Sequence, residues 1–275
     1  MTHTKNILIV ALVIINVFFL AYFGWGVYRD NAVKKQMYRE LYELMIQNGI
    51  LLDTSNISKD GEMYRLDTTR DLVEEQRLAQ TLLGETTAVE QGGSVITTYI
   101  GKSGQAVFRS GGEFDITFSE SVFKADGNAE RMTRKILKSI GIETVFIDVA
   151  ATDGKETVTA VCAWTDFRIF DCRIQFTYIN GRLVEISGKH VANIRVTADK
   201  TEMSASSAAT ALMGFLHLVK EGKYTCAAIM GVSPGYSFTA ATYGDGSLNP
   251  VWRIDADSGV YYVDAVTGAV EQGVN

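Results

Sequence analysis

The chain has 275 residues, of which 47% are hydrophobic and 21% are charged, with 25 glycines and only 2 prolines. This composition is typical of a folded globular protein and excludes collagen-like repeats, disordered tails and small disulfide scaffolds. Of the 26 Lys+Arg and 32 Asp+Glu, only Lys5 lies in residues 1–28, so residues 29–275 carry a formal charge of −7. This acidic balance disfavours nucleic acid as a partner, because phosphate contacts dominate such binding.

The first predicted element is an apolar run from Ile7 to Gly26, in which Asn16 is the one strongly polar side chain. About 20 apolar residues cross a hydrocarbon core of ~30 Å as a helix. Trp25 lies in the aromatic end of the run, where rings are expected at the lipid headgroups. A cleaved signal peptide is the competing interpretation, but its apolar region is shorter, about 7 to 15 residues, and ends at small residues. We therefore predict a single membrane-spanning helix.

The orientation of this helix is open on charge alone. Lys5 flanks one end, whereas Arg29, Lys34, Lys35 and Arg39 flank the other, which favours a cytoplasmic body by the positive-inside rule. That rule is weak here, because long domains translocate largely regardless of charge.

The remaining elements follow from hydrophobic periodicity, helix caps and glycine-containing turns. The expected helices cover residues 31–47, a segment from Thr69 or Asp71 to Gly84, residues 129–139, and a segment that begins near Ser204, with Ser206 or Ser207 as alternative caps, and runs to Lys220. The expected strands cover residues 64–66, several strands within 89–120, then 144–151, 157–164, 168–178, 182–187, 236–243, 251–256 and 260–264. Asp153-Gly154 and Asn180-Gly181 predict tight hairpin turns of type I′.

A helix followed by antiparallel hairpins recurs about three times, which predicts an α+β fold with helices on one face of meandering sheets. The expected organisation is a tail and membrane anchor over 1–28, a membrane-proximal α+β subdomain over 29–125 and a carboxy-terminal α+β subdomain over 126–275. A single continuous body is also compatible with the loop lengths.

Three cysteines, Cys162, Cys172 and Cys226, cannot all pair within the chain. Cys162 and Cys172 lie in neighbouring strand-like runs, so one disulfide is possible in an oxidising compartment, and buried free thiols are the alternative that we favour. No Cys-x-x-Cys spacing for metal or redox chemistry is present.

Residues with catalytic potential are scattered. His190 and His217 have no metal-ligating residues at ligand spacing. Ser121-x-x-Lys124 matches the first motif of acylating serine enzymes, but the companion motifs Ser-Asp-Asn and Lys-Thr-Gly are missing. Asp255-x-Asp257 resembles the start of a calcium loop without its later ligands, so a solvated hairpin turn is the better interpretation. We therefore expect a binding or sensing module, with no enzymatic activity and no cofactor or metal.

The stretch from Asn249 to Val270 is the most distinctive in the chain. Its Pro-x-Trp-x-Ile, Tyr-Tyr-Val-Asp-Ala and Thr-Gly pattern resembles the closing hairpin of PepSY-type domains and of the YycH/YycI regulatory proteins. The layout of the rest also resembles YycI. The motifs that carry this wider resemblance are Asn48-Gly49-Ile50, Leu82-Leu83-Gly84, the hairpin of Tyr99, Gly104 and Phe108, and Gly235-Tyr236.

The resemblance implies a bacterial cell-membrane protein with an extracytoplasmic body that modulates the sensor histidine kinase of a cell-envelope two-component system. Contact would involve transmembrane helices and outer domains, with the kinase and a YycH-like companion as partners. The family transfers no catalytic residues. The alternative is a PepSY-type module that inhibits or chaperones an exported peptidase.

Four residues are candidates for partner contact: Asn16, Trp25, Trp252 and Tyr261. Asn16 can hydrogen-bond to a partner helix within the membrane, an interaction of about 0.6–2 kcal/mol, or it is a tolerated polar residue. Trp252 and Tyr261 belong to the closing hairpin that carries the family resemblance.

Overall fold

A computed structural model describes residues 33, 35–93, 95–119, 122–125, 127–196, 205–241 and 245–273. The predicted membrane span from Ile7 to Gly26, with Asn16 and Trp25, lies outside these residues and stays a prediction. Among the helices that the structure describes, none has the length and apolar character needed to cross a membrane.

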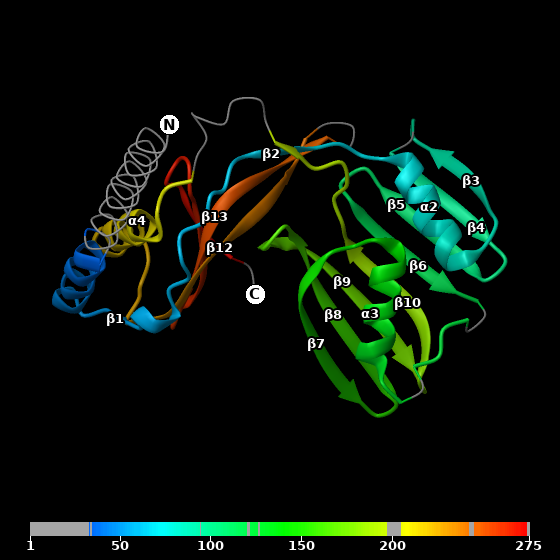
Figure 1. The fold of residues 1–275 in the computed structure, drawn as a ribbon, viewed down its shortest axis with the longest axis horizontal. Helices are drawn as coiled ribbons and strands as arrows, with labels where there is room; N and C mark the ends of the chain where they lie inside the picture. The colour runs from blue at the N-terminus through cyan, green and yellow to red at the C-terminus, as the bar shows by residue number, and fades with distance from the viewer. Residues whose placement is uncertain are drawn as a thin grey trace, which may run out of the picture.

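One arrangement, a helix followed by a four-stranded antiparallel meander, occurs three times from residue 72 onward (Figure 1). The first unit comprises α2 (Leu72–Leu83), β3 (Thr86–Gln91), β4 (Ile96–Gly101), β5 (Gly104–Arg109) and β6 (Glu113–Phe118). The second unit comprises α3 (Ala129–Ile140), β7 (Thr144–Thr152), β8 (Lys155–Trp164), β9 (Phe167–Ile179) and β10 (Arg182–Lys189). The third unit comprises α4 (Ala208–Lys220), β12 (Ala228–Ala240), β13 (Gly246–Ala256), β14 (Gly259–Asp264) and β15 (Val270–Gln272). The predicted α+β class and the recurring helix-plus-meander order are confirmed.

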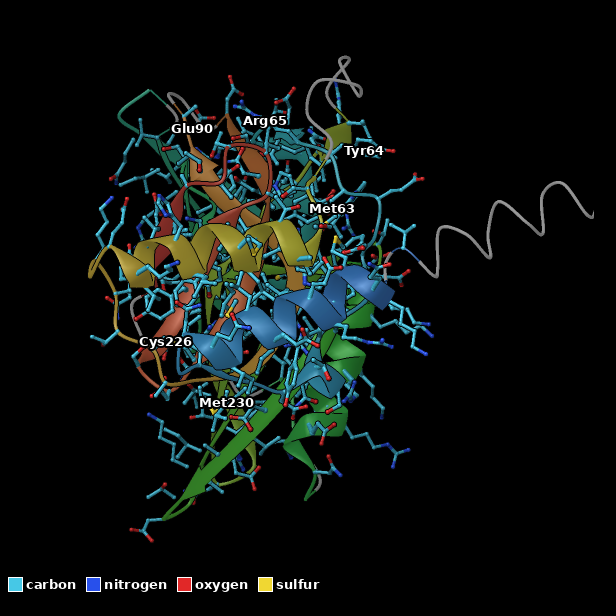
Figure 2. All side chains as sticks on the ribbon, turned by 90° about the vertical axis from the view of Figure 1, so that its left-hand side faces the viewer. Met63, Tyr64, Arg65, Glu90, Cys226 and Met230 are labelled. Carbon is cyan, nitrogen blue, oxygen red and sulfur yellow. The ribbon has the colours of Figure 1, made fainter. Side chains whose placement is uncertain are left out.

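The remaining elements lie before the first unit and between the second and third. They are a helix over residues 35–47, β1 (Leu51–Leu52), the 3-10 helix η1 (Thr54–Asn56), β2 (Leu66–Thr68) and β11 (Arg195–Val196). β1 pairs with β12 and β2 pairs with β13, so residues 51–68 are hydrogen-bonded to the third unit. The helix over residues 35–47 lies beside α4 in both views (Figures 1 and 2), and its Leu41 and Met45 are buried in the shared core.

Side-chain caps fix where the helices begin. The carboxylate of Asp71 accepts hydrogen bonds from the amides of Val73 and Glu74, which selects Asp71 over Thr69 as the cap of α2. Asn128 caps α3, and Ser207, rather than Ser206, caps α4. Each cap satisfies amides that the first helical turn leaves without a partner.

The two predicted hairpin turns are confirmed. Asp153 and Gly154 have φ values of 41° and 78°, and Asn180 and Gly181 have φ values of 49° and 72°. Positive φ at both central residues defines the type I′ turn, whose twist matches that of the flanking strands.

The predicted start of β12 is wrong by eight residues, because this strand begins at Ala228 rather than Tyr236. Gly231, Pro234 and Gly235 interrupt its hydrophobic alternation. Sterics explain why position 235 is a glycine. A Cβ at this position would lie 2.6 Å from the carbonyl oxygen of Arg168 and 2.6 Å from the Phe170 ring. At this point β12 and β9 approach as parallel neighbours, and only glycine leaves room for that approach.

All three meanders join into one hydrogen-bonded sheet. β6 of the first unit pairs antiparallel with β10 of the second, and β9 of the second pairs with β12 of the third. The predicted boundary at residue 126 falls between the first and second units, and the division into subdomains stays a prediction.

Within each unit, the described helices cover one face of the strands and leave the other face uncovered; we call the uncovered side the helix-free face. On β9, Tyr178 faces α3 and its hydroxyl lies 2.8 Å from that of Thr133. On β14, the Tyr261 ring lies 4.8 Å from the Phe215 ring of α4. Since side chains alternate along a strand, Arg173 of β9 and Tyr262 of β14 point to the opposite, helix-free face.

Candidate functional site

A groove of about 710 Å³ lies on the helix-free face where the three units meet. Its lining comes mainly from β9, β10 and β12–β15, with Glu113 of β6 added from the first unit. Charged residues are prominent in this lining: Glu113, Asp171, Arg173, Lys189, Asp264 and Glu271. A concave site with both charge signs is suited to binding an extended polar ligand.

A second hollow of about 400 Å³ adjoins the groove, because Phe170 and Arg173 line both. We call it the arginine pocket. Its other lining residues are Asp148, Thr159, Val161, Arg168 and Arg253. The pocket thus joins β7, β8 and β9 of the second unit to β13 of the third.

Several of the charged groups hold the groove together. The Asp171 carboxylate of β9 accepts hydrogen bonds from the Ser237 hydroxyl at 2.7 Å and the Phe238 amide at 2.8 Å, both on β12. The Lys189 ammonium of β10 lies 3.2 Å from a Glu113 carboxylate oxygen of β6. These contacts cross the junctions between the units, so the groove walls are fixed relative to one another.

Aromatic rings line the boundary between the groove and the arginine pocket. The Phe170 and Tyr262 rings have centroids 5.3 Å apart, and the Arg253 guanidinium lies 5.8 Å from the Phe170 centroid. Two guanidinium nitrogens of Arg253 donate to one Asp255 carboxylate oxygen, at 2.7 and 2.9 Å. Burial raises the pKa of the Tyr262 hydroxyl, so it remains a neutral hydrogen-bonding group at physiological pH.

A separate hollow of about 50 Å³ surrounds His190, between α2, β5, β6 and the segment that follows β10. The Nδ1 atom of His190 is buried without a hydrogen-bond partner among the described residues. Burial lowers the pKa of this imidazole to about 4, and the nearby Glu74 carboxylate opposes part of that shift. Beside it, Arg70 and Glu75 form an ion pair with a nitrogen to oxygen distance of 2.6 Å.

Of the four residues proposed from sequence, the structure describes Trp252 and Tyr261, which lie on the paired strands β13 and β14. Asn16 and Trp25 lie outside the described residues. Trp252 and Tyr261 are each only 1% exposed, and the Trp252 indole donates to the Ser206 carbonyl oxygen at 2.8 Å. A partner on the surface would therefore touch neither ring directly, and their involvement in partner contact stays a prediction.

The other residues singled out from sequence have structural partners or lie outside the description. The Asp257 carboxylate accepts from the Ala228 and Ala227 amides, which lowers its pKa and holds the β13–β14 turn against the start of β12. His217 is exposed and lies 3.1 Å from Glu221. Ser121 is outside the described residues, and Lys124 forms a strand bridge with Arg182.

The cysteines are free thiols. Burial raises the pKa of Cys162 to about 12 and raises that of Cys172 well above its usual range. A thiol that stays protonated is a poor nucleophile, so neither group is poised for reaction.

The sequence interpretation missed the groove residues. Arg173, Arg253 and Tyr262 alternate with buried residues on their strands, which is a signal for an exposed face. Nothing in a single strand, however, indicates that β9 and β13 lie close enough to share a pocket.

Comparisons with known proteins show a shared fold. No family model matches the chain, and no curated protein matches it. A solved structure of an uncharacterized protein from Eubacterium rectale ATCC 33656 is similar at a TM-score of 0.52 and 8% identity, covering 82% of this chain and 91% of that one. The Bacillus megaterium YpeB C-terminal domain is similar at a TM-score of 0.38 and 12% identity, covering 76% of this chain and 100% of that one, which is too distant to support an inference. The resemblance to YycI-type proteins stays a prediction, and the chain shares its overall fold with the Eubacterium rectale protein.

Proposed function

We propose that this protein is a membrane-anchored extracytoplasmic binding module that modulates a sensor histidine kinase of the cell envelope. The groove on the helix-free face is the observation that carries this proposal, because it is a preformed concave surface joining all three units. The kinase as partner, the outward orientation and the family assignment rest on the predicted span and on the resemblance in the closing hairpin.

The groove is linked to the segment that follows the predicted anchor. Residues 35–47 form a helix beside α4, and β1 immediately after it pairs with β12, which lines the groove. The third unit therefore joins the membrane-proximal helix to the binding surface. Occupancy of the groove and contacts of the anchor would thus act on one connected body, which suits a protein that shifts the conformation of a membrane partner.

We propose binding rather than catalysis at this site. The Asp171 carboxylate accepts a hydrogen bond from β12, and the Glu113 carboxylate forms an ion pair with Lys189. The Asp264 carboxylate accepts from the amides of Val266 and Thr267. Groups held in such contacts fix the shape of a surface. A general acid or base needs a titratable group that is free to face a substrate.

Co-purification tests this function. Tagged full-length protein, isolated from membranes in mild detergent, should recover a histidine kinase in quantitative mass spectrometry. Replacing Tyr262 by alanine should reduce that recovery about tenfold or more, since buried aromatic anchors dominate interface energy. Val73→Ala is the control, because Val73 is 78% exposed on α2, away from the groove.

Recovery of no histidine kinase would contradict the proposal, as would equal recovery by the Tyr262→Ala variant. Recovery of an exported peptidase instead would favour the alternative function of peptidase inhibition or chaperoning.

A further inference from the structure

The arginine pocket differs in charge from the protein around it. Its lining contains Arg168, Arg173 and Arg253 but only one carboxylate, that of Asp148. Residues 29–275 as a whole carry more acidic than basic groups. Asp255 neutralises Arg253, and Arg168 has an interaction partner within the structure. Arg173 is therefore the guanidinium whose positive charge a bound anion would neutralise.

The three arginines are not equivalent. Arg253 is held by Asp255 and lies against the Phe170 ring, so its position is fixed. Arg173 is exposed and forms no ion pair within the part of the chain that the structure describes. Its planar guanidinium presents several donors at the entrance shared with the groove, which matches the geometry of a carboxylate.

The size and opening of the pocket indicate what kind of anion fits. A hollow of about 400 Å³, whose lining includes Phe170, Thr159 and Val161, has room for a whole acidic side chain. It shares Phe170 and Arg173 with the larger groove of about 710 Å³. An anion in the pocket can therefore belong to a longer ligand that continues along the groove.

The remainder of the groove favours a polypeptide as that ligand. Its lining contains hydrogen-bonding side chains, Ser237, Thr239, Asn249 and Gln272, and the aromatic ring of Tyr262. Glu271 of β15 adds a carboxylate away from the arginine pocket. Positively and negatively charged side chains beside hydrogen-bonding groups complement an extended peptide that carries charges of both signs.

We propose that the arginine pocket binds the carboxylate of an aspartate or glutamate side chain in a polypeptide that occupies the groove. This inference rests on the proposed binding function and adds the feature by which the partner is recognised. Arg173 contacts the carboxylate, and Arg253, positioned by Asp255 and Phe170, completes the positive environment.

Selection from random peptides tests the proposal. The full chain in lipid nanodiscs is used to select phage-displayed random nonapeptides. The bound pool should be enriched at least about tenfold in peptides with an aspartate or glutamate at one fixed position, the size expected of a charge-assisted pair. In the pool selected by the Arg173→Glu variant, the enrichment in aspartate or glutamate should vanish, and lysine or arginine should be enriched at that position instead.

The matched control is Arg134→Glu, since Arg134 is an exposed arginine on α3, on the helix-covered side. It should select the same acidic peptides as the unaltered protein. Circular dichroism of both variants should match that of the unaltered protein, because both side chains are exposed.

Absence of acidic enrichment, or the same enrichment with Arg173→Glu, would overturn the proposal. The co-purification experiment can succeed, with kinase recovery that depends on Tyr262, while the peptide selection shows no acidic enrichment. That combination would show that the groove binds its partner by other contacts. Failure of both experiments would remove the binding function itself.

Discussion

Replacing Trp252 by alanine is expected to lower the free energy of unfolding by about 3–5 kcal/mol, the range for deleting a large buried ring. The Trp252 side chain is 1% exposed, and its indole N–H donates to the Ser206 carbonyl oxygen just before α4 begins. The substitution therefore removes packing inside the third unit and leaves the Ser206 carbonyl oxygen without this donor. Urea unfolding of the full chain, followed by far-UV circular dichroism, measures the change.

Trp252→Phe separates the two contributions. Phenylalanine retains part of the ring packing but lacks the N–H donor, so the expected loss is smaller than for alanine. Val149→Ala on β7 is the exposed control, with an expected change of at most about 0.5 kcal/mol. A loss below about 1 kcal/mol for Trp252→Ala would show that this ring is not a core residue of the third unit.

The stability of the protein is expected to fall between pH 6.5 and pH 4 because of His190. Burial favours the neutral imidazole in the folded protein and lowers its pKa from 6.5 to about 4. The contribution is therefore fully present above pH 6.5, falls as the pH decreases and is lost near pH 4. A shift of this size corresponds to about 3 kcal/mol.

The variant His190→Gln isolates this effect, because glutamine does not titrate. The free energy of unfolding is measured for both proteins across this pH range. Between pH 6.5 and pH 4 it should fall more steeply in the unaltered protein than in the variant, and the difference is the His190 contribution. Glu74, Glu75, Asp71, Arg70 and Arg109 also line the hollow, and all are retained in both proteins. Parallel stability profiles would contradict a buried, neutral His190.

Local chemistry made much of the fold predictable. Asp71, Asn128 and Ser207 cap helices because their side chains accept from free amides, and that preference is visible in sequence. The Asp153-Gly154 and Asn180-Gly181 turns are equally local signals. The start of β12 was missed because Gly235 is required by the close packing of β12 against Arg168 of β9. Arg168 is distant in sequence, so no local pattern indicates this contact.

The candidate site was less predictable. The sequence interpretation selected Trp252 and Tyr261 because they belong to the closing hairpin that carries the family resemblance, and they face α4 rather than a partner surface. Alternation along a strand separates two faces, but it does not show which face a helix will cover. The polar neighbours Arg253 and Tyr262, which pair across β13 and β14 on the free face, were therefore overlooked.

Site-specific photo-crosslinking in intact cells tests the central claim, that the groove binds a partner protein, most directly. A photoreactive amino acid in place of Tyr262 should form one discrete adduct with a membrane protein, identified by mass spectrometry as a histidine kinase. The same group in place of Val73, which is exposed on the outer face of α2, should form none. No adduct from Tyr262, or equal adducts from both positions, would contradict the account.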